Sequence, residues 1–379
     1  MSSTLPSIPS NKLLYIDHIK VLLTILVVLH HAVVAYSSAD GWYYTEKSSH
    51  IAALVPMKMF LSINQSFFMG FFFLLSAYFT APSYDRKGAS KFIIDRLLRL
   101  GLPLLFYCFV LSPFISYLVY YFAKGHPITY LQYLSGYDTW IDPGVMWFVA
   151  ALLVFNFCYV IGRSLDSLTF KKTLAAPSTL VILLFAVSLG LLSFLIRIIF
   201  PVGWVLKPLG FQLGHFPQYI ALFIFGLIAY RNQWFDGLSK RTGKYLKWSA
   251  WLCLLFFPVF FVIQVKLKMP VAWYAGGFHW QSLLYALWEQ WIGISILTTL
   301  LIWGKRVWNT SSMLFGSLVR CSFAVYIFHP IVIVALTLLL KNWAVDAAVK
   351  LLIVAPLAVL GSFLLGKIIL WIPGAKRII

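Results

Sequence analysis

The chain has 379 residues, of which 61% are hydrophobic, 18% aromatic and only 11% charged. Soluble domains carry about 25% charged residues, so a water-soluble globular domain is excluded, and the ten-residue alternation typical of a membrane β-barrel is absent. The net charge of +19 comes from cations spread over short loops between apolar runs, which argues against a nucleic-acid partner.

Apolar runs separated by charged residues, Pro and Gly predict an all-α integral membrane protein, since about 20 helical residues cross the core of a bilayer. Lys and Arg gather in alternate loops and in both tails, so the positive-inside rule predicts cytoplasmic termini. No linker interrupts the runs, and we expect residues 1–379 to form one multi-pass domain in the inner (cell) membrane. The bundle of about ten transmembrane helices is expected at 20–38, 56–81, 97–123, 144–163, 178–200, 216–231, 247–267, 280–303, 315–340 and 347–371.

Two further features of the sequence limit the chemistry. Residues 1–12 lack the order of basic, apolar and small residues that marks a cleavable signal peptide, so the first apolar run is expected to stay in the protein. The cysteines all lie inside apolar runs, where a disulfide framework is not expected. These residues are Cys108, Cys158, Cys253 and Cys321.

The first predicted helix carries two ionisable residues on one face. Lys20 and His31 are eleven positions apart, or three turns, which separates them by roughly 16 Å along the helix axis. His30 points about 80° to 100° away from that face. An intramembrane imidazole can simply bond a neighbouring helix, but intramembrane ionisable residues more often mark function. His31 is therefore the leading functional candidate.

Polar and basic residues surround the connection between the second and third predicted helices. Ser76 and Tyr78 lie among aromatic residues, where small polar residues are also ordinary packing residues. Arg96 and Arg99 stand at i and i+3 on one helix face, and such a pair can hold phosphates bidentately. Considered alone, the two arginines are more simply explained as anchors at the cytoplasmic interface.

Two later helices are predicted to carry a second imidazole and a carboxylate. Tyr326 and His329 stand at i and i+3, and Pro330 removes an amide donor, so the carbonyl of Tyr326 is expected to be free in mid-membrane. Glu289 lies inside an apolar run and must pair with another group. We expect it to orient a histidine, or to satisfy Arg320 or a hydroxyl.

Aromatic residues mark the opposite face of the predicted bundle. Trp147 and Phe148 begin a helix there, as part of an aromatic belt or as the rim of a cavity. The loop 40–44, with the sequence DGWYY, has the aromatic character on which sugars stack, and interfacial anchoring explains it equally well.

A metal centre is only a minor option. His31, His329 and Glu289 could in principle form a His/His/carboxylate set. No HExxH motif or paired histidine spacing supports it, so no metal is expected. Phosphate-binding loops, dinucleotide-binding motifs and nucleophile elbows are also absent from the sequence.

Taken in order, these residues resemble membrane acyltransferase family 3, multi-spanning O-acyltransferases that use acyl-coenzyme A (acyl-CoA). Bacterial glycan O-acetyltransferases and the glucan-modifying succinyltransferase are similar. The resemblance covers nearly the whole chain, with Lys20 where many members have Arg and Ala77 where Gly is common. Its motifs are Tyr15-Ile16-Asp17-x-x-Lys20 with His31, Phe73-x-x-Ser76-Ala77-Tyr78, Arg96-x-x-Arg99 with Pro103, Trp147-Phe148, Gln218-Tyr219, Phe225-Gly226 and Tyr326-x-x-His329.

The resemblance implies a ten-helix bundle with a cytoplasmic mouth for acyl-CoA and an extracytoplasmic opening for the acceptor. It also implies that His31 is the catalytic base, and that Lys20, Arg96 and Arg99 handle the donor. The acyl group is expected to be acetyl, with succinyl or a longer group left open. The acceptor is expected to be a hydroxyl of a glycan or another cell-surface molecule.

The expected mechanism is removal of the acceptor proton by His31 while the oxygen attacks the thioester, with a covalent acyl-enzyme left open. Candidates for supporting catalytic roles are Ser76, Tyr78, Glu289 and His329. The alternative function is a transporter or flippase of a lipid-linked or acyl substrate, with the histidines as a proton relay. A structural scaffold is a distant third. The expected partners are membrane lipids and the acceptor, and the oligomeric state is left open.

Overall fold

The computed structural model describes residues 13–38, 41–165 and 174–378, so residues 1–12 and the first residue of the loop 40–44 lie outside the described part. Within these ranges the regular structure is helical, apart from one isolated bridge between Leu206 and Phe211. Ten helical segments of the described chain are long and apolar enough to cross a membrane. The prediction of an all-α, multi-pass membrane protein is therefore confirmed.

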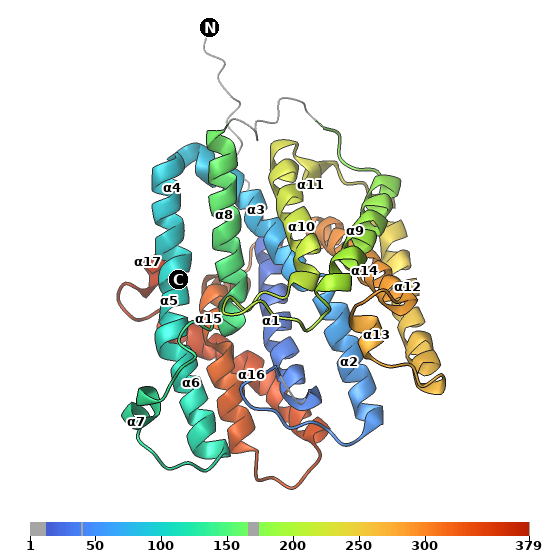
Figure 1. Cartoon of the computed structure of the whole chain (residues 1–379). Coiled ribbons are helices and arrows are strands. Elements are labelled where there is room, and N and C mark those ends of the chain that lie inside the picture. The colour runs from blue at the N-terminus through green and yellow to red at the C-terminus, as the bar shows by residue number, and fades with distance from the viewer. Residues whose placement is uncertain (1–12, 39–40, 166–173, 379) are drawn as a thin grey trace.

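The observed elements follow the expected order (Figure 1). The spanning elements are α1 (Leu14–Ser37), α2 (Ile51–Gln65) with α3 (Phe68–Lys87), the segment from α4 (Ala89–Arg96) to η3 (Val119–Ala123), α8 (Trp147–Ser164), α9 (Thr179–Ile199), α10 (Phe216–Arg231), α12 (Lys240–Lys266), α14 (Trp280–Val307), α15 (Met313–Leu339) and α16 (Ala347–Ile369). The short helices are α7 (Tyr130–Ser135), η4 (Gly144–Met146), η5 (Leu213–His215), α11 (Trp234–Gly237), α13 (Ala272–Ala275) and α17 (Ala375–Ile378).

The second expected helix is in fact two helices, which corrects the prediction of one helix at 56–81. α2 ends at Gln65 and α3 begins at Phe68. At the break, the Ser66 hydroxyl donates to the Ile63 carbonyl (2.6 Å), and the Ser66 carbonyl accepts from Gln218 Nε2 (2.6 Å). The break is stable because the backbone group it frees finds a side-chain partner on another helix.

The third spanning segment starts at Ala89 rather than at 97, and it alternates between α-helical and wider π-helical turns. The wide turns are η1 (Leu97–Gly101), η2 (Tyr107–Leu111) and η3, separated by α5 (Leu102–Phe106) and α6 (Ser112–Leu118). α5 and α6 each contain a proline in their first turn. A proline inside a helix removes an amide donor, and wide turns accommodate the lost bond.

Helix α1 is central to the bundle. It packs against α2, α3, α14, α15 and α16, while α10 covers α3 and α9 covers α14. Helices α3 and α10 approach closely because Gly226 has no side chain: a Cβ there would lie 2.3 Å from the Leu74 carbonyl oxygen. At the periphery, the most apolar stretch of α12 is not buried by the described part of the protein, as expected for a lipid-facing helix.

The two ends of α1 define two faces of the bundle. Near the start of α1, Lys20 lies over the ring of Phe79, in the second half of α3, with Nζ 4.3 Å from the ring centroid. We call this end the near face. The far face holds the end of α1, the start of α2 and the connection between α15 and α16.

The loop between α1 and α2 is fixed on the far face by polar contacts. The Glu46 amide donates to the Ala35 carbonyl (2.8 Å), and Lys350 Nζ, 3% exposed, donates to the Glu46 carboxylate (2.5 Å). Asp346 caps α16 through the Ala348 amide and accepts from the Ser48 hydroxyl (2.7 Å). These bonds hold the pKa of Asp346 down, at about 2. The loop is therefore held on the far face at two of its residues, Glu46 and Ser48.

Candidate active site

The site centres on two histidines from α1 and α15. His31 Nδ1 lies 3.0 Å from His329 Nε2, and His329 Nδ1 lies 2.8 Å from the Tyr326 carbonyl oxygen. His329 is fully buried. The expectation that the Tyr326 carbonyl is free was wrong, because the imidazole one turn later takes the place of the amide that Pro330 lacks.

This geometry assigns the protons of the neutral histidine pair. A carbonyl only accepts, so the proton of His329 is on Nδ1 and its Nε2 is an acceptor. His31 then carries its proton on Nδ1, which is also 3.0 Å from the Val27 carbonyl oxygen. The remaining nitrogen of His31, Nε2, keeps its lone pair and can take a proton from a substrate.

Aromatic rings cover the imidazoles of His30 and His31, which are adjacent residues of α1. Trp42, from the anchored loop, stacks on His31 with ring centroids 4.6 Å apart and an interplanar angle of 23°. His30 points elsewhere: Asn64 Nδ2 lies 3.2 Å from its Nδ1, and Phe68 stacks on it at 5.0 Å. The expected divergence of the two histidines is therefore confirmed, and His31 is the one that meets His329.

His31 lines two cavities. The histidine cavity, about 260 Å³, is bounded among others by His30, His215, Tyr219 and Tyr326. The aromatic recess, about 640 Å³, is bounded among others by Trp42, Tyr43, Tyr120, Tyr133 and Tyr137. Both share a wall made of His31, Gly41, Val145, Trp147 and Gln212.

The aromatic pair at the start of α8 divides between two roles. Trp147 lines both cavities, so it is part of the rim that the sequence left as one of two options. Phe148 is buried and packs against Phe73 with ring centroids 4.6 Å apart. The Tyr326 hydroxyl donates to the Val145 carbonyl just before α8, which ties this rim to α15.

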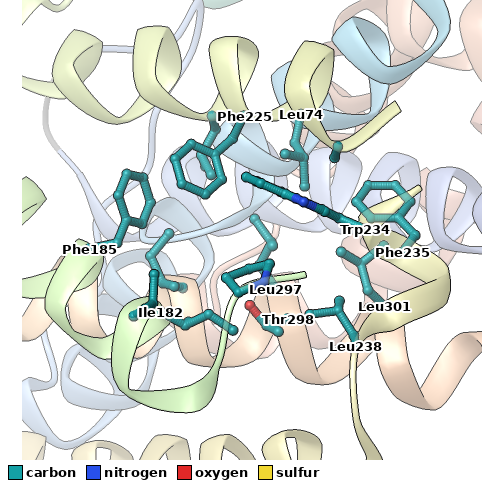
Figure 2. A pocket seen from close by; sticks show the side chains of 15 residues that line it. Leu74, Ile182, Phe185, Phe225, Trp234, Phe235, Leu238, Leu297, Thr298 and Leu301 are labelled. Carbon is teal, nitrogen blue, oxygen red and sulfur yellow. The ribbon is translucent and has the colours of Figure 1, made fainter. Parts of the chain in front are cut away.

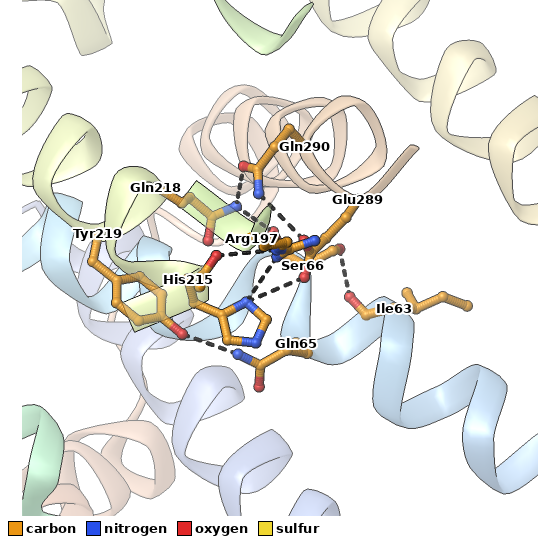
Figure 3. A network of polar contacts seen from close by, with 10 residues as sticks. Ile63, Gln65, Ser66, Arg197, His215, Gln218, Tyr219, Glu289 and Gln290 are labelled. Carbon is orange, nitrogen blue, oxygen red and sulfur yellow. Dashed lines mark hydrogen bonds and ion pairs between the residues drawn. The ribbon is translucent and has the colours of Figure 1, made fainter. Parts of the chain in front are cut away.

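A buried ionic network adjoins the histidine cavity, to which it contributes His215 (Figure 3). Arg197 of α9 and Glu289 of α14 form an ion pair with side chains 0% and 1% exposed. His215 Nδ1 lies 3.2 Å from Arg197 Nη2 and 3.4 Å from Glu289 Oε1. The His215 Nδ1 therefore faces a donor, the Arg197 guanidinium, and an acceptor, the Glu289 carboxylate. Glu289 does orient a histidine, but a different one from His31.

The network extends through neutral side chains. Gln218 Nε2 donates to Gln290 Oε1 (2.8 Å) as well as to the Ser66 carbonyl, and Gln65 Nε2 donates to the Tyr219 hydroxyl (2.9 Å). In Figure 3 the Arg197–Glu289 pair lies at the centre, with His215 between it and the Gln65–Tyr219 contact. Polar contacts thereby join α2, α9, α10 and α14 beside the histidine cavity.

Arg197 and His215 were missed by the sequence analysis. Arg197 is an arginine inside the apolar stretch Thr179–Ile199, and such a residue requires a partner in the membrane. Pairing it with Glu289, the intramembrane carboxylate, was the available signal. His215 offered no such signal, because only the fold brings η5 beside α9 and α14.

The predicted donor-handling residues lie at the near face. Lys20 Nζ is 3.3 Å from Asp17 Oδ1, and Arg99 Nε is 3.8 Å from Asp95 Oδ1. The Arg96 guanidinium stacks on Phe92, 4.8 Å from the ring centroid. In the described chain the three cations have separate partners, and helix rise puts Lys20 roughly 16 Å from the level of His31.

Ser76 and Tyr78 are not brought to His31. Phe68 meets His30 and Phe79 meets Lys20, so α3 runs antiparallel to α1. Ser76 is therefore roughly 12 Å along the axis from the level of Phe68. Tyr78 stacks on Phe235 with ring centroids 4.4 Å apart. Neither residue lines the two cavities that contain His31.

A third cavity, of about 60 Å³, lies among α3, α9, α10 and α14 and is nearly all apolar (Figure 2). Its rings include Phe185, Phe225, Trp234 and Phe235, and Thr298 contributes a hydroxyl. It offers no acid, base or nucleophile beyond that hydroxyl. Among the described residues, no group of three or more His, Cys, Asp or Glu is arranged to hold a metal ion.

Comparison with known proteins adds one finding. A family model described as an acyltransferase domain, Acyl_transf_3, matches residues 13–367. No curated protein and no solved structure matches the chain. The matched range includes both histidines of the central pair and the whole ionic network.

Proposed function

The chain belongs to membrane acyltransferase family 3, and from this premise we propose that it moves an acyl group, acetyl in the first instance, from cytoplasmic acyl-CoA to a hydroxyl of an extracytoplasmic glycan or other cell-surface acceptor. The near face is then cytoplasmic and the membrane is the inner (cell) membrane, as the distribution of cations favours. The observation that carries the proposal is that His31, which contacts His329, lies in the wall shared by two cavities.

In the proposed reaction, His31 Nε2 removes the proton of the acceptor hydroxyl as its oxygen attacks the thioester carbonyl. The tetrahedral intermediate then expels the CoA thiolate, which receives the proton from the His31 imidazolium. A general base of this kind contributes roughly 10²- to 10⁴-fold in rate. His329 accepts from His31 Nδ1 and donates to the Tyr326 carbonyl, so it fixes the His31 ring as a carboxylate does in a hydrolase triad.

The oxyanion that develops on the thioester carbonyl needs a donor. His215 lines the same histidine cavity as His31, and its Nδ1 is held beside Arg197 and Glu289. In the tautomer in which Nδ1 accepts from Arg197, Nε2 carries the proton and is directed away from both partners. We assign it the role of oxyanion donor, because fixed donors in a water-poor site are usually the largest contribution to such a reaction. Ser76 and Tyr78 lie towards the near face and have no part in this mechanism.

Donor and acceptor approach from opposite faces. Lys20, Arg96 and Arg99 at the near face are the proposed contacts for the phosphates of CoA. The roughly 16 Å between Lys20 and His31 is comparable with the length of an extended pantetheine arm, which would bring the thioester to the histidines. The aromatic recess opposite has the rings on which a sugar acceptor stacks.

The test is transfer of radiolabelled acetyl from acetyl-CoA by the purified protein in liposomes, with an added glycan acceptor and with water as the default acceptor. We expect His31→Ala to reduce turnover at least 100-fold. His279→Ala, which removes an imidazole that lines neither cavity, is expected to have wild-type turnover. Full turnover by His31→Ala would overturn the mechanism.

The same assay separates the proposal from the transporter alternative. Label retained on denatured protein would indicate a covalent acyl-enzyme, whereas label only in the product indicates direct transfer. If the wild-type protein neither binds nor consumes the donor while His31→Ala impairs the cell, a proton relay in transport replaces acyl transfer.

A further inference from the structure

A basic recess of about 460 Å³ lies where α15, α16 and α17 meet. Its polar side chains are Ser317 and Arg320 of α15, Lys367 of α16 and Lys376 of α17, and Trp371 adds an indole ring. We call it the cationic recess. It is separate from the histidine cavity and the aromatic recess, with which it shares no lining residue.

The cationic recess has an unbalanced charge. Within the described ranges no carboxylate lines it, and Arg320, Lys367 and Lys376 form no ion pair. Glu289, one of the partners that the sequence suggested for Arg320, is bound to Arg197 instead. Like charges gathered in one concave site repel each other, and a bound anion removes that repulsion.

The chemistry of the recess fits phosphate better than it fits simple anchoring at an interface. A lone cation at a helix end is explained by anchoring. Here a guanidinium, which matches phosphate bidentately, converges with two ammonium groups and a hydroxyl on one hollow. Trp371, 72% exposed, offers a face on which a nucleobase can stack.

The recess also adjoins the segment that contains Arg99, one of the predicted donor-handling arginines. α17 packs against η1, which contains Arg99, and Figure 1 shows α17 beside α5, the helix that follows η1. Arg320 is nine residues before His329 on α15, so it lies roughly 13 Å closer to the near face. A ligand bound here is on the side from which the proposed donor approaches.

We propose that the cationic recess binds phosphate groups, with Arg320, Lys367 and Lys376 as the contacts. The assignment of the ligand rests on the proposed acyl transfer. The phosphate belongs to the nucleotide end of CoA, whose base stacks on Trp371. The same chemistry is present in the headgroup of an anionic phospholipid. The experiment therefore has one arm for each source.

In the first arm, binding of CoA and of adenosine 3′,5′-bisphosphate is measured by titration calorimetry in nanodiscs of neutral lipid. The variants are Arg320→Gln, Lys367→Gln and Lys376→Gln, alone and combined. Lys244→Gln removes an exposed cation of α12 that does not line the recess and is the matched control. We expect each recess variant to raise Kd about fivefold, and the control to leave it unchanged.

In the second arm, retention of phosphatidylglycerol after delipidation is compared between the wild type and the triple variant. Loss of lipid with unchanged CoA affinity keeps the phosphate site and assigns it to the headgroup. Unchanged CoA affinity together with unchanged lipid retention overturns the proposal. Thermal unfolding of each variant checks the fold.

Acetyl transfer measured on the same proteins separates this inference from the proposed function. A raised KM for acetyl-CoA with unchanged kcat in the recess variants supports both. CoA binding that depends on the recess in a protein without transfer activity leaves the phosphate site standing and removes the acyl transfer. If the recess variants transfer acetyl normally, with unaltered KM and Kd and with unchanged lipid retention, the phosphate site is overturned. The proposed acyl transfer then still stands.

Discussion

At the scale of single residues, His329 acts through another side chain. It touches no proposed substrate atom, since its Nδ1 and Nε2 are both occupied, by the Tyr326 carbonyl and by His31. It is a positioning residue for the general base. The proton assignment of His31 depends on this contact, which makes His329 separable from His31 by experiment.

We expect His329→Ala to lower kcat about 100-fold with little change in the KM for acetyl-CoA, since the lost effect belongs to proton transfer. His329→Gln keeps an acceptor for His31 Nδ1 and should restore part of that loss. Steady-state kinetics across pH 5.5 to 9 would check it. An equal loss in the Ala and Gln variants, without any change in the pH profile, would show a merely structural role.

The Arg197–Glu289 pair makes the second residue-scale prediction. Removing one member leaves the other charge buried without a partner, which costs about 3–5 kcal/mol of stability. Arg197→Met should therefore lower the unfolding temperature strongly, whereas Arg197→Met with Glu289→Met should recover much of it. Fluorescence-monitored unfolding in detergent gives the comparison. The double variant should still transfer acetyl slowly, because His215 loses its contact with Arg197.

At the scale of elements, the closest helix contact makes a direct test. A Cβ on Gly226 would lie 2.3 Å from the Leu74 carbonyl oxygen, so Gly226→Ala must push α10 away from α3. We expect a loss of about 1–3 kcal/mol, typical of overpacking. Gly316→Ala is the control, because its nearest neighbouring atom would be 3.9 Å away. Equal unfolding temperatures for both variants would contradict the close approach.

The anchored loop between α1 and α2 makes a prediction about pH. Hydrogen bonds from the Ala348 amide and the Ser48 hydroxyl lower the pKa of Asp346 to about 2, below the ordinary value of about 3.9. The stabilisation by its charge is therefore complete above about pH 4 and is lost as the pH falls towards 2. The difference in unfolding temperature between wild type and Asp346→Asn should shrink on acidification from pH 7 to pH 3. A constant difference would contradict it.

At the scale of the whole molecule, the sequence predicted what local hydropathy controls. Ten spanning segments and their order follow from apolar runs, because a bilayer requires each crossing to satisfy its own backbone. The break at Ser66 was not predicted, since the chain there stays apolar and the partner that stabilises it, Gln218, comes from another helix. The hydropathy of one segment carries no information about hydrogen bonds between helices.

The residues of the candidate site also fall into those that the sequence predicted and those that only the fold brings together. The match of His31 and His329 to family positions placed both in the site, and the structure brings them within hydrogen-bond distance. Arg197, His215 and the shared cavity wall depend on how α9, η5 and α14 meet, which no single segment encodes. Ser76 and Tyr78 were grouped with His31 by sequence pattern, although helix rise separates them.

The wall shared by the histidine cavity and the aromatic recess bears on how the proposed acceptor would enter and leave. On the proposed route, the acceptor reaches His31 through the recess and its acylated form leaves past the same residues, because Trp147 and Gln212 border both compartments. We therefore expect accumulated product to compete with fresh acceptor for the recess.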